Sequence, residues 1–511
     1  MTDWTSGYVA DIGYTFGYYH ELNPLRARLA FLNKGLVCPN VGVACELGFG
    51  QGLSTNIHAA ASTTQWYGAD FNPSQAGFAQ ELAAISGADV SLYADSFADF
   101  CNRSDLPDFD CISLHGVWSW ISDENRQIIV NFISKKLKVG GLLYISYNTL
   151  PGWAAFAPMR HLMTQHAEII GSEGSGIVNR IDGAMSFAEK LLATNPTYLK
   201  ANPSVSERLD ILKGQPSQYL AHEYFNRDWL PMHFASTAQW LESAKVSYAC
   251  SAHYMDDIES INLTPEQQEF LNTIPDKLLR ESTRDFMVNQ VFRRDYWIKG
   301  IRKLPNLEQL EGIRKESIIL QTPRSEVGLT TKDGGREINL NAEIYNPILD
   351  ILADHKVVSL AELESKLNAE DISLAKIVQA AMVLADCGHL FVAQNKENLT
   401  EVKAQSDKLN AHIQQRARSN KEVRYLASPV TGGGIAISRF HQLFLLALQA
   451  GKKTPAGLAE SAWAVLNDQG ERLVENGKLV ESEAENISKL TSQAEIFKEK
   501  GLPVLKALQI A

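Results

Sequence analysis

Short apolar runs alternate with helix-like segments through the first 150 residues, and this order limits the possible folds more than any other feature. The runs predict strands at 41–47, 65–71, 90–96, 110–116 and 141–148. Apolar residues at helical spacing predict helices at 24–32 and near 53–62, 73–86, 97–103 and 123–138. Repeated strand–helix–strand units place neighbouring strands in parallel. The sequence therefore predicts an α/β fold with a parallel sheet covered by helices.

The chain changes character after residue 152. Residues 153–240 have the pattern of amphipathic helices with Asn-Pro breaks, and two further strands are predicted at 245–253 and 290–300. The economical interpretation is a sheet domain at 1–152, a helical insert or lid at 153–240, and late strands within 241–305 that complete the sheet. A separate domain beginning at residue 153 is the alternative.

The remaining third of the chain predicts mostly helical structure. The polar stretch around 303–340 is typical of a linker or an exposed hairpin, and residues 344–394 follow the order helix, helix, helix, strand. We therefore expect a winged-helix-like domain at 306–395 and a C-terminal helical domain at 396–511, although a helical accessory domain fits the same pattern. Basic and acidic residues alternate in 399–424, which predicts a solvated helix.

Composition excludes several classes of function. The net charge of −11 disfavours nonspecific nucleic-acid binding. The 12 histidines form no HExxH motif and no Cys/His cluster, so no metal site is expected. No apolar run approaches the ~18 residues of a membrane span, and the N-terminus lacks a signal-peptide pattern. The six cysteines are scattered without a CxxC pair, which favours reduced thiols and a cytoplasmic protein.

The stretch CELGFGQG at 45–52 follows the first predicted strand and is typical of a ligand-binding turn. It lacks the Lys-Ser/Thr pair of a phosphate-binding P-loop, and Leu53 stands where a dinucleotide-binding turn has its third glycine. The pattern E/D-x-G-x-G-x-G of S-adenosylmethionine turns is filled by Glu46, Gly48, Gly50 and Gly52. A carboxylate at position 46 opposes a pyrophosphate but suits the α-ammonium group of S-adenosylmethionine, so this cofactor is the predicted ligand.

Two acidic residues extend this prediction. Asp70 ends the second strand and is placed to accept hydrogen bonds from both ribose hydroxyls, as in other doubly wound nucleotide-binding folds. Asp95 and Ser96 end the third strand, where they are placed near the adenine amino group. As an alternative, Asp70 alone could cap the helix that follows it.

Several motifs resemble one family over nearly the whole chain. They are HGVWSW (115–120), YNTLPGW (147–153), YLAHEYFNRDWLPMHF (219–234), RDFMVNQVFRR (284–294) and LASPVTGGG (426–434). The chain resembles the bacterial class I S-adenosylmethionine-dependent methyltransferases with a methyltransferase regulatory domain, which include the rickettsial-type protein-lysine methyltransferases. The resemblance implies a Rossmann-like sheet, S-adenosylmethionine as donor and, for some members, lysine as acceptor. The N-terminus, DIGYTFGYYHELNP, departs from the Pro-rich rickettsial pattern.

Methyl transfer to lysine needs aligned reactants and a deprotonated amine, and a desolvated aromatic channel favours both. We expect Tyr14, Trp118 and His115 at the reacting centre, with His115 also beside the cofactor as a general base or as the residue that orients its loop. The expected acceptor side comprises Tyr18, Trp120, Tyr147, Asn148, Trp153 and Glu223. Core packing is the alternative for each aromatic ring.

Three functions remain open from the sequence. The leading hypothesis is methyl transfer to protein lysine, and the second is methylation of a small metabolite or surface saccharide. The third is a regulatory protein that binds the cofactor without turning it over. The expected partners are a protein or small-molecule acceptor, with the winged-helix-like region binding a partner protein or forming a homodimer.

Overall fold

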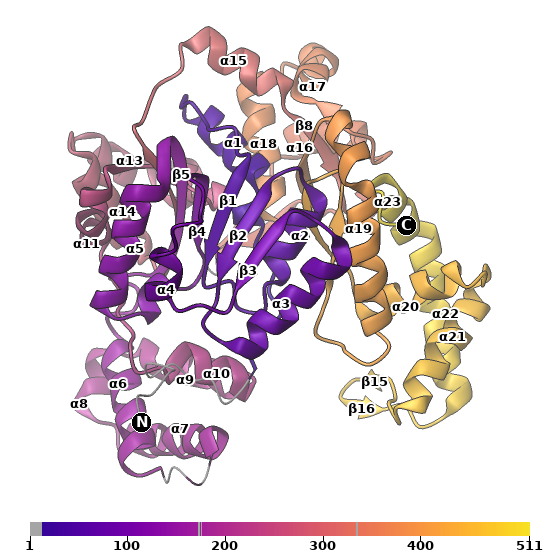
Figure 1. Ribbon diagram of the computed structural model, residues 1–511, viewed down its shortest axis with the longest axis horizontal. Helices are drawn as coiled ribbons and strands as arrows, with labels where there is room; N and C mark the ends of the chain where they lie inside the picture. Colours follow the sequence, from indigo (N-terminus) through magenta and orange to yellow (C-terminus); the bar gives the residue numbers. More distant parts are fainter. Residues whose placement is uncertain (1–12, 172–173, 175, 334–335) are drawn as a thin grey trace.

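The computed structural model describes residues 13–171, 174, 176–333 and 336–511. A seven-stranded sheet in the order β3-β2-β1-β4-β5-β7-β6 lies at its centre (Figure 1). Its strands are β1 (Val43–Leu47), β2 (Gln65–Ala69), β3 (Val90–Tyr93), β4 (Phe109–Leu114), β5 (Leu137–Asn148), β6 (Val246–Ser251) and β7 (Phe292–Lys299). β1 to β5 are parallel, and β7 runs antiparallel between β5 and β6. All seven predicted strands and the Rossmann-like α/β class are confirmed.

Helices cover both faces of this sheet because successive residues of each strand point to opposite sides. Ala44 packs in a cluster with α1 (Pro24–Asn33), whereas Cys45 packs with residues of α4 (Phe97–Cys101) and α5 (Asp123–Lys136). α2 (Leu53–Ala61) and α3 (Pro73–Ser86) contact each other and connect β1, β2 and β3. α3 begins where Asn72 accepts hydrogen bonds from the N–H groups of the first turn and Pro73 occupies the first helical position.

The insert is a helical layer with its own apolar core. It contains α6 (Ala157–Ile169), α7 (Gly176–Ala193), α8 (Thr197–Ala201), α9 (Ser204–Lys213) and α10 (Ser217–Tyr224), which gather at one end of the molecule (Figure 1). Trp153, Phe156 and Tyr224 pack together inside this layer. The chain returns to the sheet through α11 (Phe234–Leu241), α12 (Glu259–Asn262), α13 (Pro265–Asn272) and α14 (Lys277–Val288), which flank β6 and β7 in sequence.

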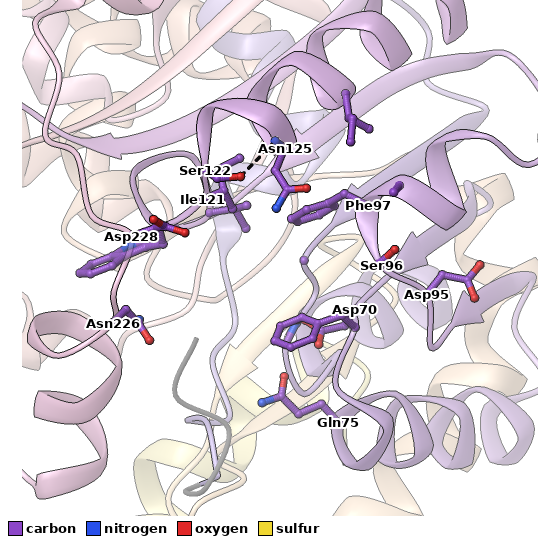
Figure 2. A pocket seen from close by; sticks show the side chains of 18 of the residues that line it. Asp70, Gln75, Asp95, Ser96, Phe97, Ile121, Ser122, Asn125, Asn226 and Asp228 are labelled. Atoms are coloured by element: carbon purple, nitrogen blue, oxygen red, sulfur yellow. Dashed lines mark hydrogen bonds between the residues drawn. The ribbon is translucent and has the colours of Figure 1, made fainter. Parts of the chain in front are cut away.

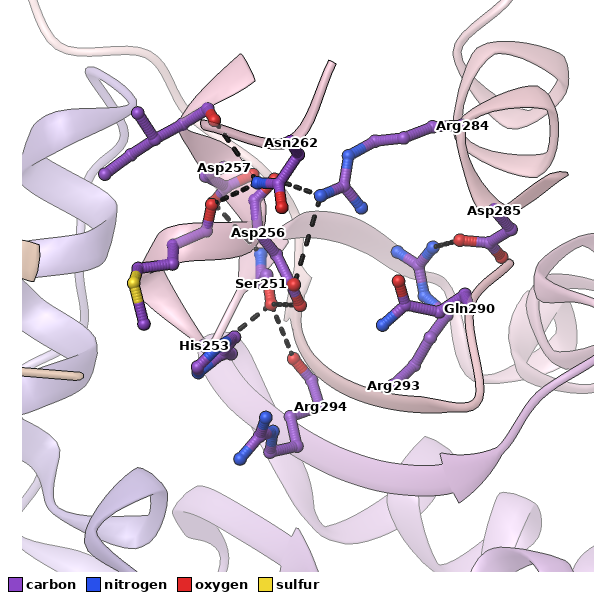
Figure 3. A network of polar contacts seen from close by, with 12 residues as sticks. Ser251, His253, Asp256, Asp257, Asn262, Arg284, Asp285, Gln290, Arg293 and Arg294 are labelled. Atoms are coloured by element: carbon purple, nitrogen blue, oxygen red, sulfur yellow. Dashed lines mark hydrogen bonds and ion pairs between the residues drawn. The ribbon is translucent and has the colours of Figure 1, made fainter. Parts of the chain in front are cut away.

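Buried charges fasten α14 to the sheet. Arg293 of β7 forms ion pairs with Asp285 of α14 at 2.6 Å and with Asp295 at 3.0 Å, and Tyr147 of β5 donates a hydrogen bond to Asp295 at 2.8 Å. Figure 3 shows Arg293 and Asp285 facing each other between helix and strand. All four side chains are almost wholly buried, so the network fixes the last strands of the sheet relative to α14.

The C-terminal third contains more structure than the sequence predicts. α15 (Asn306–Lys315) and β8 (Ser317–Leu320) lie where we expected a polar linker, and β9 (Thr330–Asp333) pairs with β10 (Arg336–Asn339) as a hairpin. β8 is central in a three-stranded sheet with β11 (Val358–Ser359) and β12 (Leu390–Ala393). The expected three helices are present as α16 (Ala342–Ile351), α17 (Leu360–Leu367) and α18 (Leu374–Asp386).

A helix is present within 399–424, as predicted, but the prediction that it is solvated is wrong. α19 (Lys396–Arg416) lies along α2 and α3, and it buries Val402, Leu409 and Ile413 (Figure 1). Its polar residues alternate with this buried stripe, so composition alone hides the packing face. After α19 come β13 (Tyr425–Ser428), β14 (Gly433–Ala436), α20 (Arg439–Gln449), α21 (Pro455–Asp468), β15 (Val474–Glu475), β16 (Lys478–Leu479), α22 (Glu483–Ile496) and α23 (Leu502–Ala507).

A buried polar cluster joins the C-terminal third to the sheet domain. Arg26 of α1 forms an ion pair with Asp386 of α18, and Asp386 also accepts a hydrogen bond from the Met255 N–H at 2.6 Å. Nδ1 of His253 lies 3.2 Å from the same carboxylate. Within the described part of the chain, no helix is long and apolar enough to cross a membrane.

Candidate functional site

The glycine turn between β1 and α2 has the backbone that its sequence predicts. Gly48, Gly50 and Gly52 all have positive φ angles, of +74°, +58° and +63°. A Cβ at position 52 would lie 2.5 Å from Cβ of Ala79, and one at position 50 would lie 3.2 Å from the ring of Tyr14. Glycine is therefore required at both positions for conformation and for space.

Asp70 ties this turn to the end of β2. One carboxylate oxygen accepts a hydrogen bond from the Gly50 N–H at 2.9 Å, and the other accepts from the Asn72 N–H at 3.0 Å. Asn72, rather than Asp70, caps α3. Burial raises the pKa of the Asp70 carboxyl to about 6, because removal from water disfavours the charged form.

A cavity of about 440 Å³ opens at the carboxyl ends of the strands (Figure 2). Eight of the residues predicted for the site line it: Tyr14, Gly48, Gly50, Asp70, Asp95, Ser96, His115 and Trp120. Apolar walls come from Phe71, Phe97, Val117, Ile121 and Ile128. Figure 2 shows Asp70 and Gln75 on one side of the cavity, with Asn226 and Asp228 across from them. The chain after α10 therefore forms the wall opposite the sheet.

Two segments that the sequence did not place at the site also line the cavity. The start of α5 contributes Ser122, Glu124, Asn125 and Ile128, and the loop after α10 contributes Asn226, Arg227 and Asp228. No local pattern places either segment at the cavity. The second segment lies within the stretch 219–234 that resembles the family. That resemblance is the one sequence feature that could have placed this segment at the cavity.

Glu46 lies beneath the glycine turn, outside the lining of the cavity, and is almost wholly buried. The Thr55 hydroxyl of α2 donates a hydrogen bond to its carboxylate. Burial raises the pKa of Glu46 to about 7, and the nearby charge of Asp70 adds to this effect. One buried carboxylate, Glu46, thus lies below the cavity and a second, Asp70, lies in its wall.

An N-terminal segment, residues 13–19, lies over the site, and we call it the strap. The Tyr19 ring stacks on His115 with centroids 3.5 Å apart, and a hydrogen bond joins the side chains of Tyr19 and Tyr14. The Tyr14 ring meets His222 of α10 edge-on at 5.0 Å. The strap therefore bridges the sheet, through His115, and the insert, through His222.

His115 is held as a neutral imidazole. Its Nδ1 lies 2.8 Å from the Tyr144 hydroxyl of β5, and Tyr19 covers its face. Burial lowers the pKa of His115 to about 4, because the charged imidazolium loses its hydration. This arrangement orients the loop after β4 and leaves a weak base.

Glu223 of α10 is half-buried and, like Gly52, does not line the cavity. Among the described residues, it forms no hydrogen bond and no ion pair. Burial raises its pKa to about 7. Burial raises the pKa of the Tyr19 hydroxyl above its ordinary value, and the negative charges of Glu46 and Glu223 raise it further. Glu223 is thus an uncompensated carboxylate beside the aromatic strap.

Five predicted residues lie away from the cavity. Trp118 is wholly buried in the core beneath α5, and Tyr147 is bound to Asp295 on the side of α14. Trp153 packs inside the insert and donates its Nε1–H to the Val291 carbonyl at 3.0 Å. The other two are Tyr18, which packs against His58 and Tyr425, and Asn148, whose backbone N–H donates to Ser119. For the four aromatic residues among them, the core-packing alternative describes what the structure contains.

The charge of the cavity is predominantly negative. Four lining side chains are carboxylates: Asp70, Asp95, Glu124 and Asp228. Among the described lining residues, Arg227 is the one guanidinium, and it lies 3.5 Å from Asp228. Such a mouth attracts cations and repels anionic ligands.

Comparisons with known proteins relate the chain to one group. The family model described as "Predicted methyltransferase regulatory domain" matches residues 216–299. The protein sll1526 of Synechocystis sp. (strain ATCC 27184 / PCC 6803 / Kazusa) is 38% identical over 513 residues, which cover 99% of this chain and 100% of that protein. The protein RP789 of Rickettsia prowazekii (strain Madrid E) is 26% identical over 253 residues, covering 47% of this chain and 44% of its own length.

Solved structures extend the likeness to the whole fold. The structure of PKMT2 from Rickettsia typhi matches with a TM-score of 0.68 and 19% identity, covering 96% of this chain and 99% of that chain. The structure of PKMT2 in complex with AdoHcy matches with a TM-score of 0.67 and 18% identity, covering 94% and 97%. The shared fold therefore includes the insert and the C-terminal third as well as the sheet.

Proposed function

Because the chain belongs to the bacterial class I S-adenosylmethionine-dependent methyltransferases that carry a methyltransferase regulatory domain, we propose that it methylates lysine side chains of a protein. The observation that carries the acceptor class is the cavity lined by four carboxylates, with an aromatic strap beside it. A cationic side chain on a flexible stem suits such a site, because it supplies the missing charge. The name PKMT2 of the solved relative agrees with this class.

The residues at the sheet edge fit the methyl donor. S-adenosylmethionine supplies an electrophilic methyl group on a sulfonium. The glycine turn accepts a ligand against its backbone because a Cβ would fill the space at Gly50 and Gly52. Asp70 offers carboxylate oxygens to ribose hydroxyls, Glu46 offers its charge to an α-ammonium, and Asp95 with Ser96 borders the adenine end.

The chain's own residues then align the acceptor. Tyr14 and Trp120 border the cavity on the strap and loop sides, where they exclude water and can hold a methylated ammonium by cation–π attraction. His115 orients the loop after β4 through its bond to Tyr144. Alignment of nucleophile and methyl group supplies most of the rate enhancement in such a displacement.

Incubation of the purified protein with methyl-labelled S-adenosylmethionine and lysate of its own host tests this proposal. We expect label in discrete protein bands and in methyl-lysine after hydrolysis. Asp70→Ala should abolish the label, whereas the control Asp468→Ala, on the exposed end of α21, should retain it. Label confined to small molecules would favour a metabolite or saccharide acceptor, and cofactor binding without any label would favour a regulatory protein.

A further inference from the structure

Two cross-strand pairs place four polar side chains on one face of the sheet, near the carboxyl end of β5. Tyr144 of β5 pairs with Tyr296 of β7, and Ser146 pairs with Arg294. Side chains two residues apart on a strand point the same way, and those directly opposite on a neighbouring strand share that face. The rings of Tyr144 and Tyr296 accordingly lie 5.8 Å apart. We call these four residues the platform.

The β5 half of the platform holds the loop after β4. The Tyr144 hydroxyl lies 2.8 Å from Nδ1 of His115, and the Ser146 hydroxyl accepts a hydrogen bond from the Gly116 N–H at 2.8 Å. His115 and Gly116 both line the cavity. This half of the platform therefore fixes one edge of the cavity.

The β7 half holds the short 3-10 helix η1 (His20–Leu22), which directly follows the strap. Arg294 donates from Nη1 to Oε1 of Glu21 at 3.1 Å, and the Tyr296 hydroxyl donates to the Glu21 carbonyl at 2.6 Å. Nε2 of His20 lies 3.7 Å from the same carboxylate oxygen. The Glu21 side chain is only 6% exposed and that of Arg294 is 28% exposed. Water therefore screens this ion pair less than it screens a pair at the surface.

Tyr19 connects the two elements that the platform holds. It is the last residue of the strap, and its ring stacks on His115 with centroids 3.5 Å apart. Its N–H donates to the Ser54 hydroxyl of α2 at 3.2 Å. This stacking requires a fixed spacing between η1 and the loop after β4. The ion pair of Glu21 and Arg294 supplies that spacing from the η1 side.

We infer that Glu21 and Arg294 are positioning residues for methyl transfer, an inference that rests on the proposed function. Neither residue lines the cavity. Their ion pair acts through Tyr19, which holds the loop of His115 at the spacing that aligns acceptor and donor. Arg294 ends the family-like stretch 284–294, which contributes no residue to the lining of the cavity. Positioning of the strap gives this end of the stretch a role in the reaction.

The first test measures the rate of methyl-lysine formation in host lysate at saturating S-adenosylmethionine. Glu21→Ala and Arg294→Ala should each lower this rate about 10- to 100-fold, because a misplacement of about 1 Å costs up to about 100-fold. The double variant should be no slower than the slower single variant, since the two residues act as one pair. Losses that multiply in the double variant would overturn the inference.

Arg324→Ala is the matched control. The Arg324 side chain is also 28% exposed, and it forms an ion pair with Asp350 at 2.7 Å, away from the strap. This variant should retain the wild-type rate. A loss as large as that of Arg294→Ala would show that any such ion pair has this effect, and it would contradict a positioning role.

The titration of His115 separates positioning from stabilisation of the fold. Burial lowers the pKa of His115 to about 4, and the negative charge of Glu21 raises it in part. Glu21→Ala removes that charge, so the pKa should fall further if Tyr19 stays on His115. If the strap moves and water reaches the ring, the pKa should rise towards its ordinary value of about 6.5. We expect the rise, measured by NMR of ring-labelled histidine with His115→Gln to assign the resonance. A fall or an unchanged pKa would overturn the inference.

Glu21→Asp decides the matter if Glu21→Ala does not fold. It keeps the charge but shortens the side chain by one methylene, so the carboxylate reaches Arg294 only if the strap moves. A raised pKa of His115 with a lower rate supports the inference, and unchanged values of both contradict it. The titration needs no acceptor. Wild-type protein that forms no methyl-lysine would therefore overturn the proposed function, while the titration still shows whether the ion pair holds the strap.

Discussion

Gly434→Ala should weaken both the fold and the cofactor site, because Tyr18 of the strap rests on the glycines of β14. A Cβ at position 434 would lie 2.8 Å from Cδ2 and 2.9 Å from Cε2 of Tyr18, and 3.1 Å from the Ile57 side chain. Ordinary contacts begin near 3.4 Å, so two ring atoms must move by about half an ångström. Overpacking of this kind costs about 1–3 kcal/mol.

The Tyr18 ring has little room to move. It lies 5.0 Å from the ring of His58 and 5.4 Å from that of Tyr425, and a hydrogen bond joins its hydroxyl to the Gly434 backbone. The displacement must therefore pass along the strap to Tyr19, the next residue. Because Tyr19 stacks on His115 at the cavity, we expect weaker binding of S-adenosylmethionine together with the loss of stability.

Chemical denaturation and calorimetric binding measure the two effects. Tyr18→Ala alone should cost about 3–5 kcal/mol because it leaves a cavity. The double variant should cost little more than Tyr18→Ala, since the clash at Gly434 no longer exists. The matched control is Gly77→Ala in α3, where a Cβ meets nothing within 4 Å and helix propensity improves. Additive effects of Tyr18→Ala and Gly434→Ala would refute the clash as the cause.

Four further changes test the site and its support. Asp70→Asn should weaken S-adenosylmethionine binding by about 10- to 100-fold in calorimetry, because each hydrogen bond to a charged group contributes about 1.5–3 kcal/mol; unchanged affinity would exclude Asp70 as a ribose ligand. Gly50 has a φ of +58°, a backbone conformation that disfavours a side chain, so Gly50→Ala should prevent cofactor binding. Equilibrium dialysis measures this binding, and binding retained by Gly50→Ala would contradict the expectation. Cofactor affinity should rise about tenfold between about pH 6 and pH 8, because the pKa of Glu46 is raised to about 7 and an ammonium pairs only with the ionised form; a flat profile would contradict this role. Asp386→Ala should destabilise the protein by about 3–5 kcal/mol in denaturant, because it leaves Arg26 buried and unpaired.

The sheet was predictable because its information is local. Each strand is a short apolar run of the length that a buried parallel strand needs, and the predicted ranges differ from the observed strands by only a few residues at each end. β8 was missed because its four residues stand inside a charged stretch, where pairing with β11 and β12 overrides composition. α19 was misjudged for a related reason: only Val402, Leu409 and Ile413 mark a face whose partner is about 340 residues away in sequence.

The wall of the cavity on the glycine-turn side was predictable, and most of the wall opposite the sheet was not. Gly48, Gly50 and Asp70 lie in one βαβ unit, where strand ends meet by construction. Trp118 belongs to the same motif as His115, but it begins a short 3-10 helix (Trp118–Trp120) and packs in the core, while strand alternation turns Tyr147 of β5 into the core. Asn226 and Asp228 reach the cavity only because the whole insert folds back over the sheet edge, and no periodicity in the sequence predicts that docking.

The division of the site between two parts of the chain has a functional consequence. The sheet supplies the glycine turn and two buried carboxylates, whereas the regulatory-domain segment supplies Asn226, Arg227 and Asp228. The strap touches both, through His115 and His222, and Tyr18 anchors it to the C-terminal hairpin. A change anywhere in this chain of contacts therefore alters the spacing between donor and acceptor, on which in-line transfer depends. Because the regulatory-domain segment lines the cavity, we expect variants within it to change the rate of transfer more than the affinity for the cofactor.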